Sequence, residues 1–360
     1  MSLPPLEKIP PEVVSVDDYE ALARERIDPE VWAYLAGGSA DERTLRENRE
    51  AFDKRRLSPR VLVDFSGANT RVELFGRTFS HPILIAPTAF HRLVHPQGEL
   101  ATVLGAAALE AGMVVSTQAS VSLEDVAATT GSPLWFQLYI QPDRGFTGEL
   151  IRRAEAVGYE ALVITVDAPV NGLRNREQRA GFRLPSGIEP LNLRGLASPA
   201  ACSSVFDPAY ESGLPKWEDL VWLKAQTRLP VLLKGVLAPE DAAKALEAGV
   251  DGLIVSNHGG RTLDTVPSTL EVLPHVADEV AGRIPVLMDG GIRRGTDILK
   301  AIALGADAVM IGRPVLHGLA VAGATGVAHV LKILRSELEV AMLLAGRPTL
   351  ASIDRSVLWD

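Results

Sequence analysis

Two short glycine-containing segments combine the residue types of a catalytic histidine and of an anion site. Residues 256–261 read Ser-Asn-His-Gly-Gly-Arg and follow the apolar run 252–255. Residues 289–295 read Asp-Gly-Gly-Ile-Arg-Arg-Gly and follow the apolar run 284–288. Histidine exchanges a proton near neutral pH, and glycine turns beside arginines suit a phosphate or a carboxylate. Each segment follows an expected short buried strand, so the sequence predicts an enzyme.

Apolar runs of the kind expected for buried parallel strands recur along the chain. The eight runs are residues 82–86, 113–116, 134–138, 161–166, 230–234, 252–255, 284–288 and 308–311. Helical stretches such as 97–111, 148–157, 239–248 and 295–304 separate most of them. This alternation predicts an α/β fold, the (β/α)8 or TIM barrel, whose binding site lies at the carboxyl ends of the strands.

The chain is predicted to form a single domain. Residues 12–75 are expected to be an N-terminal helical cap, with helices over 17–36 and 41–52, and residues 81–345 the barrel. The connection 168–216 after the fourth strand is long and rich in Pro, Gly, Ser and Asn. Long loops in compact domains are often functional, so we expect a mobile lid, with a passive surface insertion as the alternative.

Composition excludes several classes of protein. The 360 residues are 47% hydrophobic and 22% charged, which suits a globular enzyme. A net charge of -9 argues against a nucleic-acid partner. No signal peptide and no window of roughly 20 apolar residues is apparent, so we expect a cytoplasmic protein without membrane contact. The single cysteine, Cys202, cannot form a thiolate metal cluster, and no metal is expected.

Polar residues lie at the ends of the predicted strands. Side chains alternate along a strand, so Gln137 and Tyr139 project to one side, as do Thr165 and Asp167. Lys234 ends a buried strand, and burial disfavours its charge unless an anion lies nearby. We therefore expect Lys234 to face an anion in the mouth of the barrel.

The seventh and eighth strands are followed by an expected phosphate site. Gly290 and Gly291 allow close approach of the backbone, Arg293 adds charge, and Gly312 and Arg313 precede the last helix. Barrels often bind phosphate in the loops after these two strands. No Gly-x-Gly-x-x-Gly segment follows a strand, so a dinucleotide-binding fold is not supported.

Taken together, these motifs resemble the FMN-dependent L-2-hydroxy acid oxidases and dehydrogenases, which include glycolate oxidase, lactate oxidase and mandelate-oxidising enzymes. The resemblance extends from about residue 17 to the C-terminus. Its strongest parts are residues 256–264, 289–295 and 311–314, and weaker support comes from 85–89, 95–99, 136–139 and 165–167. It implies FMN as the cofactor and a small 2-hydroxy acid as the substrate.

The resemblance implies a role for each matching residue. The implied catalytic residues are His258, Asp167, Tyr139 and Lys234. The implied substrate-binding residues are Tyr34, Arg174, Arg261, Tyr139 and His258. The implied FMN-binding residues are Pro87, Thr88, Ala89, Ser116, Gln137, Thr165, Lys234, Ser256, Asp289, Gly290, Gly291, Arg293, Gly312 and Arg313. His258 would take a proton from the substrate with Asp167 as its partner, while the other six histidines are expected to be structural.

The implied reaction converts an L-2-hydroxy acid to the 2-oxo acid, and O2 reoxidises the flavin to give hydrogen peroxide. The small Ala89, the lack of a preceding haem domain and the lack of a hydrophobic insertion favour O2. Alternatives are a dehydrogenase that uses a quinone or another acceptor, a decarboxylating monooxygenase, an FMN barrel such as an isoprenoid-precursor isomerase, and a non-catalytic barrel. His258 would remove either the hydroxyl proton or the α-proton.

Substrate choice follows from a departure from the family pattern. Gln118 stands where glycolate oxidases commonly have a tryptophan. Loss of the indole favours aryl or longer aliphatic 2-hydroxy acids beside lactate. The resemblance also implies a homotetramer or homo-octamer, for which apolar residues within 323–344 could form a contact.

Overall fold

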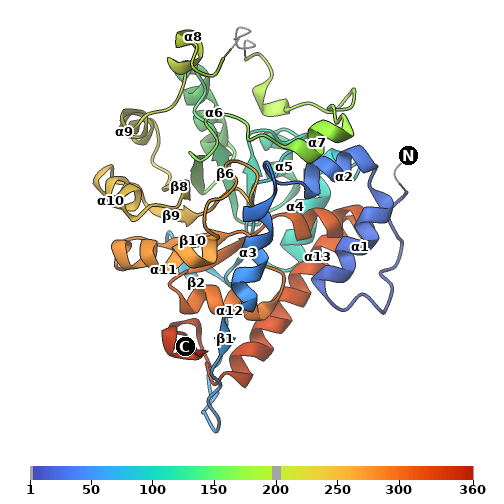
Figure 1. Cartoon of the computed structure of the whole chain (residues 1–360), viewed down its shortest axis with the longest axis vertical. Helices are drawn as coiled ribbons and strands as arrows, with labels where there is room; N and C mark the ends of the chain where they lie inside the picture. Colours follow the sequence, from blue (N-terminus) through green and yellow to red (C-terminus); the bar gives the residue numbers. More distant parts are fainter. Residues whose placement is uncertain (1–2, 197–203, 360) are drawn as a thin grey trace.

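The computed structural model describes residues 3–196 and 204–359. In this part of the chain eight parallel strands close into a barrel in the order β10-β11-β4-β5-β6-β7-β8-β9 (Figure 1). The strands are β4 (Ile83–Ile85), β5 (Met113–Ser116), β6 (Leu134–Leu138), β7 (Ala161–Thr165), β8 (Val231–Val236), β9 (Gly252–Val255), β10 (Val286–Asp289) and β11 (Ala308–Ile311). The predicted (β/α)8 barrel is therefore confirmed.

Helices surround this barrel and connect its strands. They are α4 (Glu99–Ala108), α5 (Leu123–Thr129), α6 (Arg144–Ala156), α9 (Trp217–Ala225), α10 (Pro239–Glu247), α11 (Thr269–Val280), α12 (Gly295–Ala303) and α13 (Arg313–Leu344). The strand predictions are correct to within two residues at every end. Among the helices, α6 begins at Arg144 and not at residue 148, and α13 contains a non-helical break at Ala322 and Gly323.

Alternation along the strands builds the inside of the barrel. Interior positions such as Leu84, Val114, Trp135, Val163 and Leu232 form one buried apolar cluster. The antiparallel hairpin of β2 (Val72–Leu74) and β3 (Arg77–Phe79) adds Leu74 and Phe79 to that cluster. This hairpin was not among the predicted elements, and it packs against the barrel interior through these two side chains.

The N-terminal helices lie beside the barrel and near its mouth. They are α1 (Val16–Arg26), α2 (Pro29–Ala36) and α3 (Arg43–Asp53), so the expected helix over 17–36 is two helices. The break falls at Ile27 and Asp28, just before a proline that begins α2. In Figure 1 α1 runs along α13, and α2 lies next to α7 (Asn175–Ala180).

The connection after β7 contains short helices as well as loops. It includes α7, a 3-10 turn at Leu191–Leu193 and α8 (Pro208–Glu211). Cys202 lies outside the described residues. The mobility expected of this connection stays a prediction.

Helix α13 changes one expectation drawn from composition. By length and apolar content it could cross a membrane, whereas no such window was expected. However, 78% of the relevant window is buried inside the protein, as for the core helix of a soluble domain.

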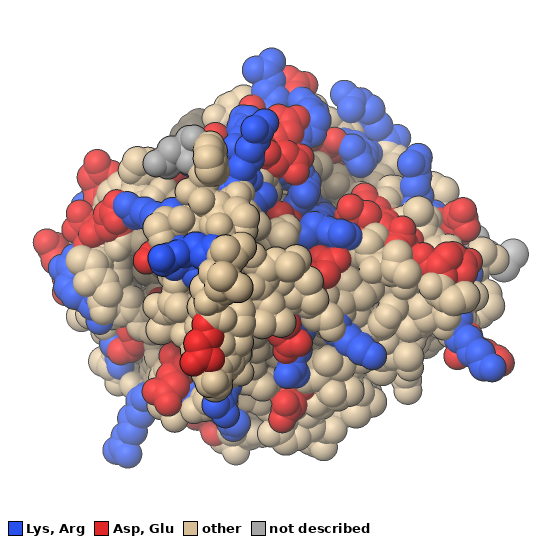
Figure 2. Space-filling model, turned by 90° about the horizontal axis from the view of Figure 1, so that it is seen from below, with Lys and Arg blue, Asp and Glu red and all other residues tan. Residues whose placement is uncertain are grey.

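On the face shown in Figure 2, basic and acidic residues are interspersed and form no continuous basic field.

Candidate active site

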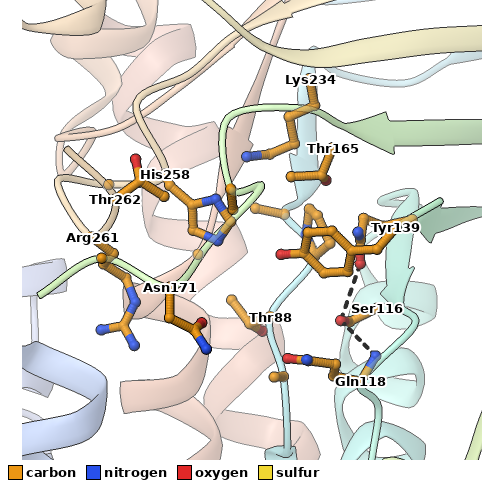
Figure 3. A pocket seen from close by; sticks show the side chains of 18 of the residues that line it. Thr88, Ser116, Gln118, Tyr139, Thr165, Asn171, Lys234, His258, Arg261 and Thr262 are labelled. Atoms are coloured by element: carbon orange, nitrogen blue, oxygen red, sulfur yellow. Dashed lines mark hydrogen bonds between the residues drawn. The ribbon is translucent and has the colours of Figure 1, made fainter. Parts of the chain in front are cut away.

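One large cavity of about 790 Å³ opens at the carboxyl ends of the barrel strands. This volume lies within the range of small-molecule and cofactor sites, about 300–1,000 Å³. Every residue proposed above for catalysis, substrate or cofactor lines this cavity, except Asp167 and Ser256. Those two lie behind it, hydrogen-bonded to lining residues. The structure therefore brings the whole predicted set together (Figure 3).

Polar side chains form the last interior layer of the barrel. Each follows a buried apolar interior residue by two positions, as Lys234 follows Leu232 and Asp289 follows Leu287. The layer consists of Ser116, Gln137, Thr165, Lys234, Ser256 and Asp289, all 7% exposed or less. The strand periodicity that fills the barrel with apolar groups thus ends in a polar floor for the cavity.

Lys234 is the central charge of this floor. Its Nζ lies 3.0 Å from Asp289 Oδ2 and donates to Ser256 Oγ at 2.8 Å. Burial alone would lower the pKa of Lys234, but the charges of Asp289 and Asp167 hold it above the ordinary value. The expectation that Lys234 faces an anion is confirmed, and the nearest anion is Asp289.

His258 and Asp167 form the pair that the sequence analysis predicted. His258 Nδ1 and Asp167 Oδ1 are 3.0 Å apart, which leaves Nε2 as the ring nitrogen available to the cavity. Burial alone would raise the pKa of Asp167, but the hydrogen bond and charge of His258, with the charge of Lys234, hold it below the ordinary carboxyl value. An ionised Asp167 therefore stabilises a protonated His258.

A buried amide pair holds the loop of His258. Asn48 on α3 and Asn257 exchange two hydrogen bonds, of 2.9 and 2.8 Å, and Asn257 Oδ1 also accepts from the Gly260 amide. His258 itself has a positive φ of 56°. Such a backbone needs support from its surroundings, and this pair supplies it. No sequence pattern indicates the pairing, because α3 meets this loop only in the folded chain.

Two arginines and a tyrosine form one wall of the cavity. The Arg261 and Arg174 guanidinium carbons lie 5.1 and 5.9 Å from the centre of the Tyr34 ring. Phe182 stacks on the same tyrosine at 4.5 Å, a contact that the sequence did not indicate. Arg261 Nη1 donates to the carbonyl oxygens of Tyr34 and Gly37, whereas its other nitrogens have no hydrogen bond among the described residues. They can therefore receive an anion.

The base of the long connection fixes Arg174. The Leu173 carbonyl accepts a 2.7 Å hydrogen bond from the Ala40 amide, so this segment is joined to the turn before α3. A Cβ atom on Gly172 would lie 2.3 Å from the carbonyl oxygens of both Arg261 and Thr262. Only glycine allows this approach, which places Arg174 and Arg261 on the same wall.

Two further arginines, Arg293 and Arg313, line the cavity, and Arg313 shares the Gly37 carbonyl oxygen with Arg261. Burial, reinforced by Arg261 and Arg293, lowers the pKa of Arg313 to about 9. Arg313 donates to the carbonyl oxygens of Leu35, Gly37 and Gly259. Burial also lowers the pKa of Arg293, and neither arginine has a salt bridge in the described part of the chain. An anion bound here would stabilise both charges.

Packing against neighbouring helices is a further reason for the glycine pair at residues 290 and 291. A Cβ atom on Gly291 would lie 2.0 Å from the Asn48 carbonyl oxygen, and one on Gly290 would lie 2.9 Å from Thr269 Oγ1. Contact with α3 and α11 therefore already requires both glycines, before any phosphate is considered.

The residues present fit FMN. Gln137 Nε2 and Asp289 Oδ1 are buried without a hydrogen-bond partner, so they are available to polar atoms of a bound ring and sugar chain. The cationic end at Arg293 and Arg313 suits a phosphate, and the volume suits the whole group. Among the described residues no cluster of His, Cys, Asp and Glu could hold a metal ion.

The outer part of the cavity is built from loops. Gln118, from the loop after β5, lines it together with Leu193, Tyr210 and Leu214 of the long connection. Figure 3 shows Gln118 on the side opposite Arg261, with Asn171 between them. The Gln118 side chain makes no hydrogen bond to a described residue, whereas Asn171 accepts one from Arg174.

Comparison with known proteins identifies relatives over most of the chain. The family model described as FMN-dependent dehydrogenase matches residues 23–360. An L-lactate oxidase of Nostoc sp. is 48% identical over 96% of this chain and 98% of its own length. A 2-hydroxyacid oxidase of Dictyostelium discoideum is 46% identical over 96% of this chain and 90% of its own length. A mandelate oxidase variant solved with (S)-mandelic acid superposes with a TM-score of 0.88 at 41% identity, covering 96% of this chain and 98% of that one.

We predict that Gly172→Ala weakens carboxylate binding. The added Cβ would overlap two carbonyl oxygens at 2.3 Å and separate the walls that carry Arg174 and Arg261. The dissociation constant for a small carboxylate, measured by calorimetry on cofactor-loaded protein, is expected to rise about tenfold, the loss of one charge-assisted hydrogen bond. Gly148→Ala is the control, because a Cβ there meets nothing within 4 Å. Equal affinities in the two variants would contradict the prediction.

Proposed function

The chain belongs to the FMN-dependent dehydrogenase family and oxidises 2-hydroxy acids to 2-oxo acids with FMN; we propose that it takes L-2-hydroxy acids larger than glycolate and passes the electrons to O2. The observation that carries the chemistry is the His258–Asp167 pair, 3.0 Å apart, beside a wall that holds Arg174 and Arg261. A proton acceptor next to two guanidinium groups is what a hydroxy acid requires.

Substrate binding begins with the carboxylate. Arg261 and Arg174 both lie against the Tyr34 ring, and Arg261 has nitrogens that make no hydrogen bond to a described residue. A guanidinium group binds a planar carboxylate through two parallel hydrogen bonds. The carboxylate also reduces the repulsion between the two cations, so binding is favourable although the protein has a net charge of -9.

Proton transfer then falls to His258. Asp167 holds Nδ1 of His258, so Nε2 accepts the proton from the substrate. The Asp167 carboxylate then stabilises the imidazolium that forms. Tyr139 lines the same space, and its hydroxyl is oriented toward His258 in Figure 3. Burial raises the pKa of Tyr139, so its hydroxyl stays protonated and can donate a hydrogen bond to the substrate oxygen.

FMN supplies the two-electron acceptor when it is bound. Lys234 contributes a fixed positive charge at the floor of the cavity, where it favours added negative charge. Gln137 and Asp289 would hold the ring and sugar chain, and Arg293 and Arg313 the phosphate. An isomerase of isoprenoid precursors has no use for paired arginines beside a histidine, which favours hydroxy acid oxidation over that rival.

The outer cavity supports the choice of a large side chain. Gln118 replaces a bulkier residue common in glycolate oxidases, and apolar residues of the long connection line the same space. Oxidases named for lactate and a mandelate oxidase are among the relatives, and both names fit an acid larger than glycolate. The oxidase names also support O2 as the acceptor. We further propose a cytoplasmic homo-oligomer, a tetramer or an octamer.

Anaerobic reduction followed by air tests this function. Purified holoenzyme is mixed with glycolate, L-lactate or L-mandelate, and its visible spectrum is recorded. We expect mandelate or lactate to bleach the flavin, and air to restore it with one hydrogen peroxide for each 2-oxo acid. Bleaching without recovery would indicate another electron acceptor, and a decarboxylated product a monooxygenase. No bleaching with any acid would refute the proposed substrate class.

Gln118→Trp should shift the substrate preference toward small acids. An indole ring would fill the outer cavity next to Leu193 and Tyr210. The ratio of kcat/KM for mandelate to that for glycolate is expected to fall at least about tenfold, because steric differences in such pockets are worth about 1–3 kcal/mol. Gln118→Leu, which is similar in volume to glutamine, should keep the ratio. An unchanged ratio in the tryptophan variant would show that Gln118 does not limit side-chain size.

Asp167→Asn should lower kcat far more than it changes KM. The variant keeps the shape but removes the charge that stabilises protonated His258, so kcat is expected to fall by about 10²–10⁴-fold. Because the pKa of Asp167 is lowered in the folded protein, the wild-type enzyme keeps this charge at every pH above the ordinary carboxyl value. Asp64→Asn, in an exposed loop, serves as the control. Steady-state kinetics gives kcat and KM for each variant, and the flavin absorbance shows that the variants contain equal amounts of cofactor.

A further inference from the structure

A buried histidine outside the predicted site lies in the loop after β4. His91 is 1% exposed and begins a 3-10 turn at His91–Leu93, two residues beyond the cavity-lining Ala89. It was expected to be structural. Its two ring nitrogens, however, connect a cavity residue to the helix behind it, and nothing in the mechanism above uses this connection.

Both ring nitrogens of His91 contact threonine hydroxyls. Nε2 lies 2.5 Å from Thr88 Oγ1, and Nδ1 lies 2.8 Å from Thr102 Oγ1 on α4. Thr88 lines the cavity, whereas Thr102 is fully buried. Burial lowers the pKa of His91, so the ring is neutral and carries one N–H.

The hydrogen bonds of Thr102 determine which nitrogen carries that proton. The Thr102 hydroxyl donates to the carbonyl oxygen of Gly98, one turn earlier in the helix, at 3.4 Å. This bond to the fourth preceding residue is a common one for helical threonine. With the Thr102 proton directed to Gly98, we assign the ring proton of His91 to Nδ1, which donates to Thr102 Oγ1. In this tautomer Nε2 carries no proton and accepts from the Thr88 hydroxyl.

The surrounding contacts hold the backbone of the loop that carries His91. The buried Glu99 carboxylate accepts hydrogen bonds from the His91 amide and from the amide and hydroxyl of Ser120. The Phe90 amide donates to the Gln118 carbonyl oxygen. The loop that follows β4 is therefore joined both to α4 and to the loop after β5.

We propose that His91 is a positioning residue that makes the Thr88 hydroxyl a hydrogen-bond acceptor toward bound FMN. A hydroxyl has one proton, and Thr88 gives it to His91 at 2.5 Å. Only its lone pairs then face the cavity, so its partner on FMN is a donor, either a ribityl hydroxyl or a ring N–H. The proposal concerns cofactor binding and is independent of which hydroxy acid is oxidised.

Cofactor affinity in a double-mutant cycle tests the proposal. Apoproteins of Thr88→Val, His91→Leu and the double variant are titrated with oxidised FMN and, under dithionite, with reduced FMN, following the tryptophan fluorescence of the protein. Each single variant is expected to bind at least one form about threefold to tenfold more weakly, the range for one neutral hydrogen bond. The double variant should bind no more weakly than Thr88→Val, because His91 acts through Thr88. Thr88→Ser should restore wild-type affinity.

The matched control is His81→Leu. His81 is also 1% exposed and precedes β4, but its Nε2 contacts the Leu109 carbonyl oxygen, away from the cavity. Loss of this buried histidine is expected to change thermal stability and to leave FMN affinity unchanged. The comparison separates an effect transmitted through Thr88 from general destabilisation.

The redox state that loses affinity identifies the donor. Equal losses in both states indicate a donor that both forms carry, and a loss confined to reduced FMN indicates the N–H gained on reduction; both support the proposal. A loss confined to oxidised FMN, wild-type affinity in His91→Leu, or additive losses would overturn it. If His91→Leu does not fold, the variant Thr102→Val is used in its place. Thr102→Val removes the acceptor of the His91 Nδ1–H and should lower FMN affinity as Thr88→Val does. Unchanged FMN affinity in Thr102→Val would refute the proposal.

Discussion

The buried ammonium group of Lys234 is the charge on which the geometry of the site depends. It contacts Asp289 at 3.0 Å and donates to Ser256 Oγ, which in turn accepts from the backbone amide of His258 at 3.1 Å. Loss of either Lys234 or Asp289 would leave an uncompensated charge in the barrel, which is costly. Strands β8, β9 and β10 are therefore held in one arrangement at their ends, and the position of the base His258 follows from that arrangement.

A second constraint is an excess of positive charge around the cavity. Arg261, Arg293 and Arg313 have no salt bridge within the described residues, and Arg261 and Arg313 instead donate to carbonyl oxygens at the end of α2. Those carbonyls form the negative end of the helix dipole, so they orient the guanidinium groups without neutralising them. The field in the cavity is thus opposite in sign to the net charge of -9, and it suits two anions, a carboxylate and a phosphate.

Features of the structure could be predicted from the sequence where the residues that determine them are close together in the chain. The barrel strands could be predicted because both faces of each strand are buried, so the strands read as continuous apolar runs, and alternation then located Lys234 and Thr165. The break between α1 and α2 does carry a local signal, Pro29, although the pattern of residues 17–36 suggests one helix. The Asn48–Asn257 pair and the stacking of Phe182 on Tyr34 could not be predicted, because each joins segments that meet only after folding and neither shows any periodicity.

The residues that determine the reaction and those that determine the substrate range lie in different parts of the cavity. Side chains placed to act on the proton or the cofactor are held by hydrogen bonds to neighbouring residues, as Asp167 is by His258 and Thr88 is by His91. Gln118 lies in the same cavity, yet its side chain has no hydrogen bond to the described residues. Substitution at Gln118 can therefore change the space for the substrate side chain while the proton acceptor stays in place. A family with one reaction and many substrates requires this separation, and here the strand ends determine the reaction while the loops determine which acid fits.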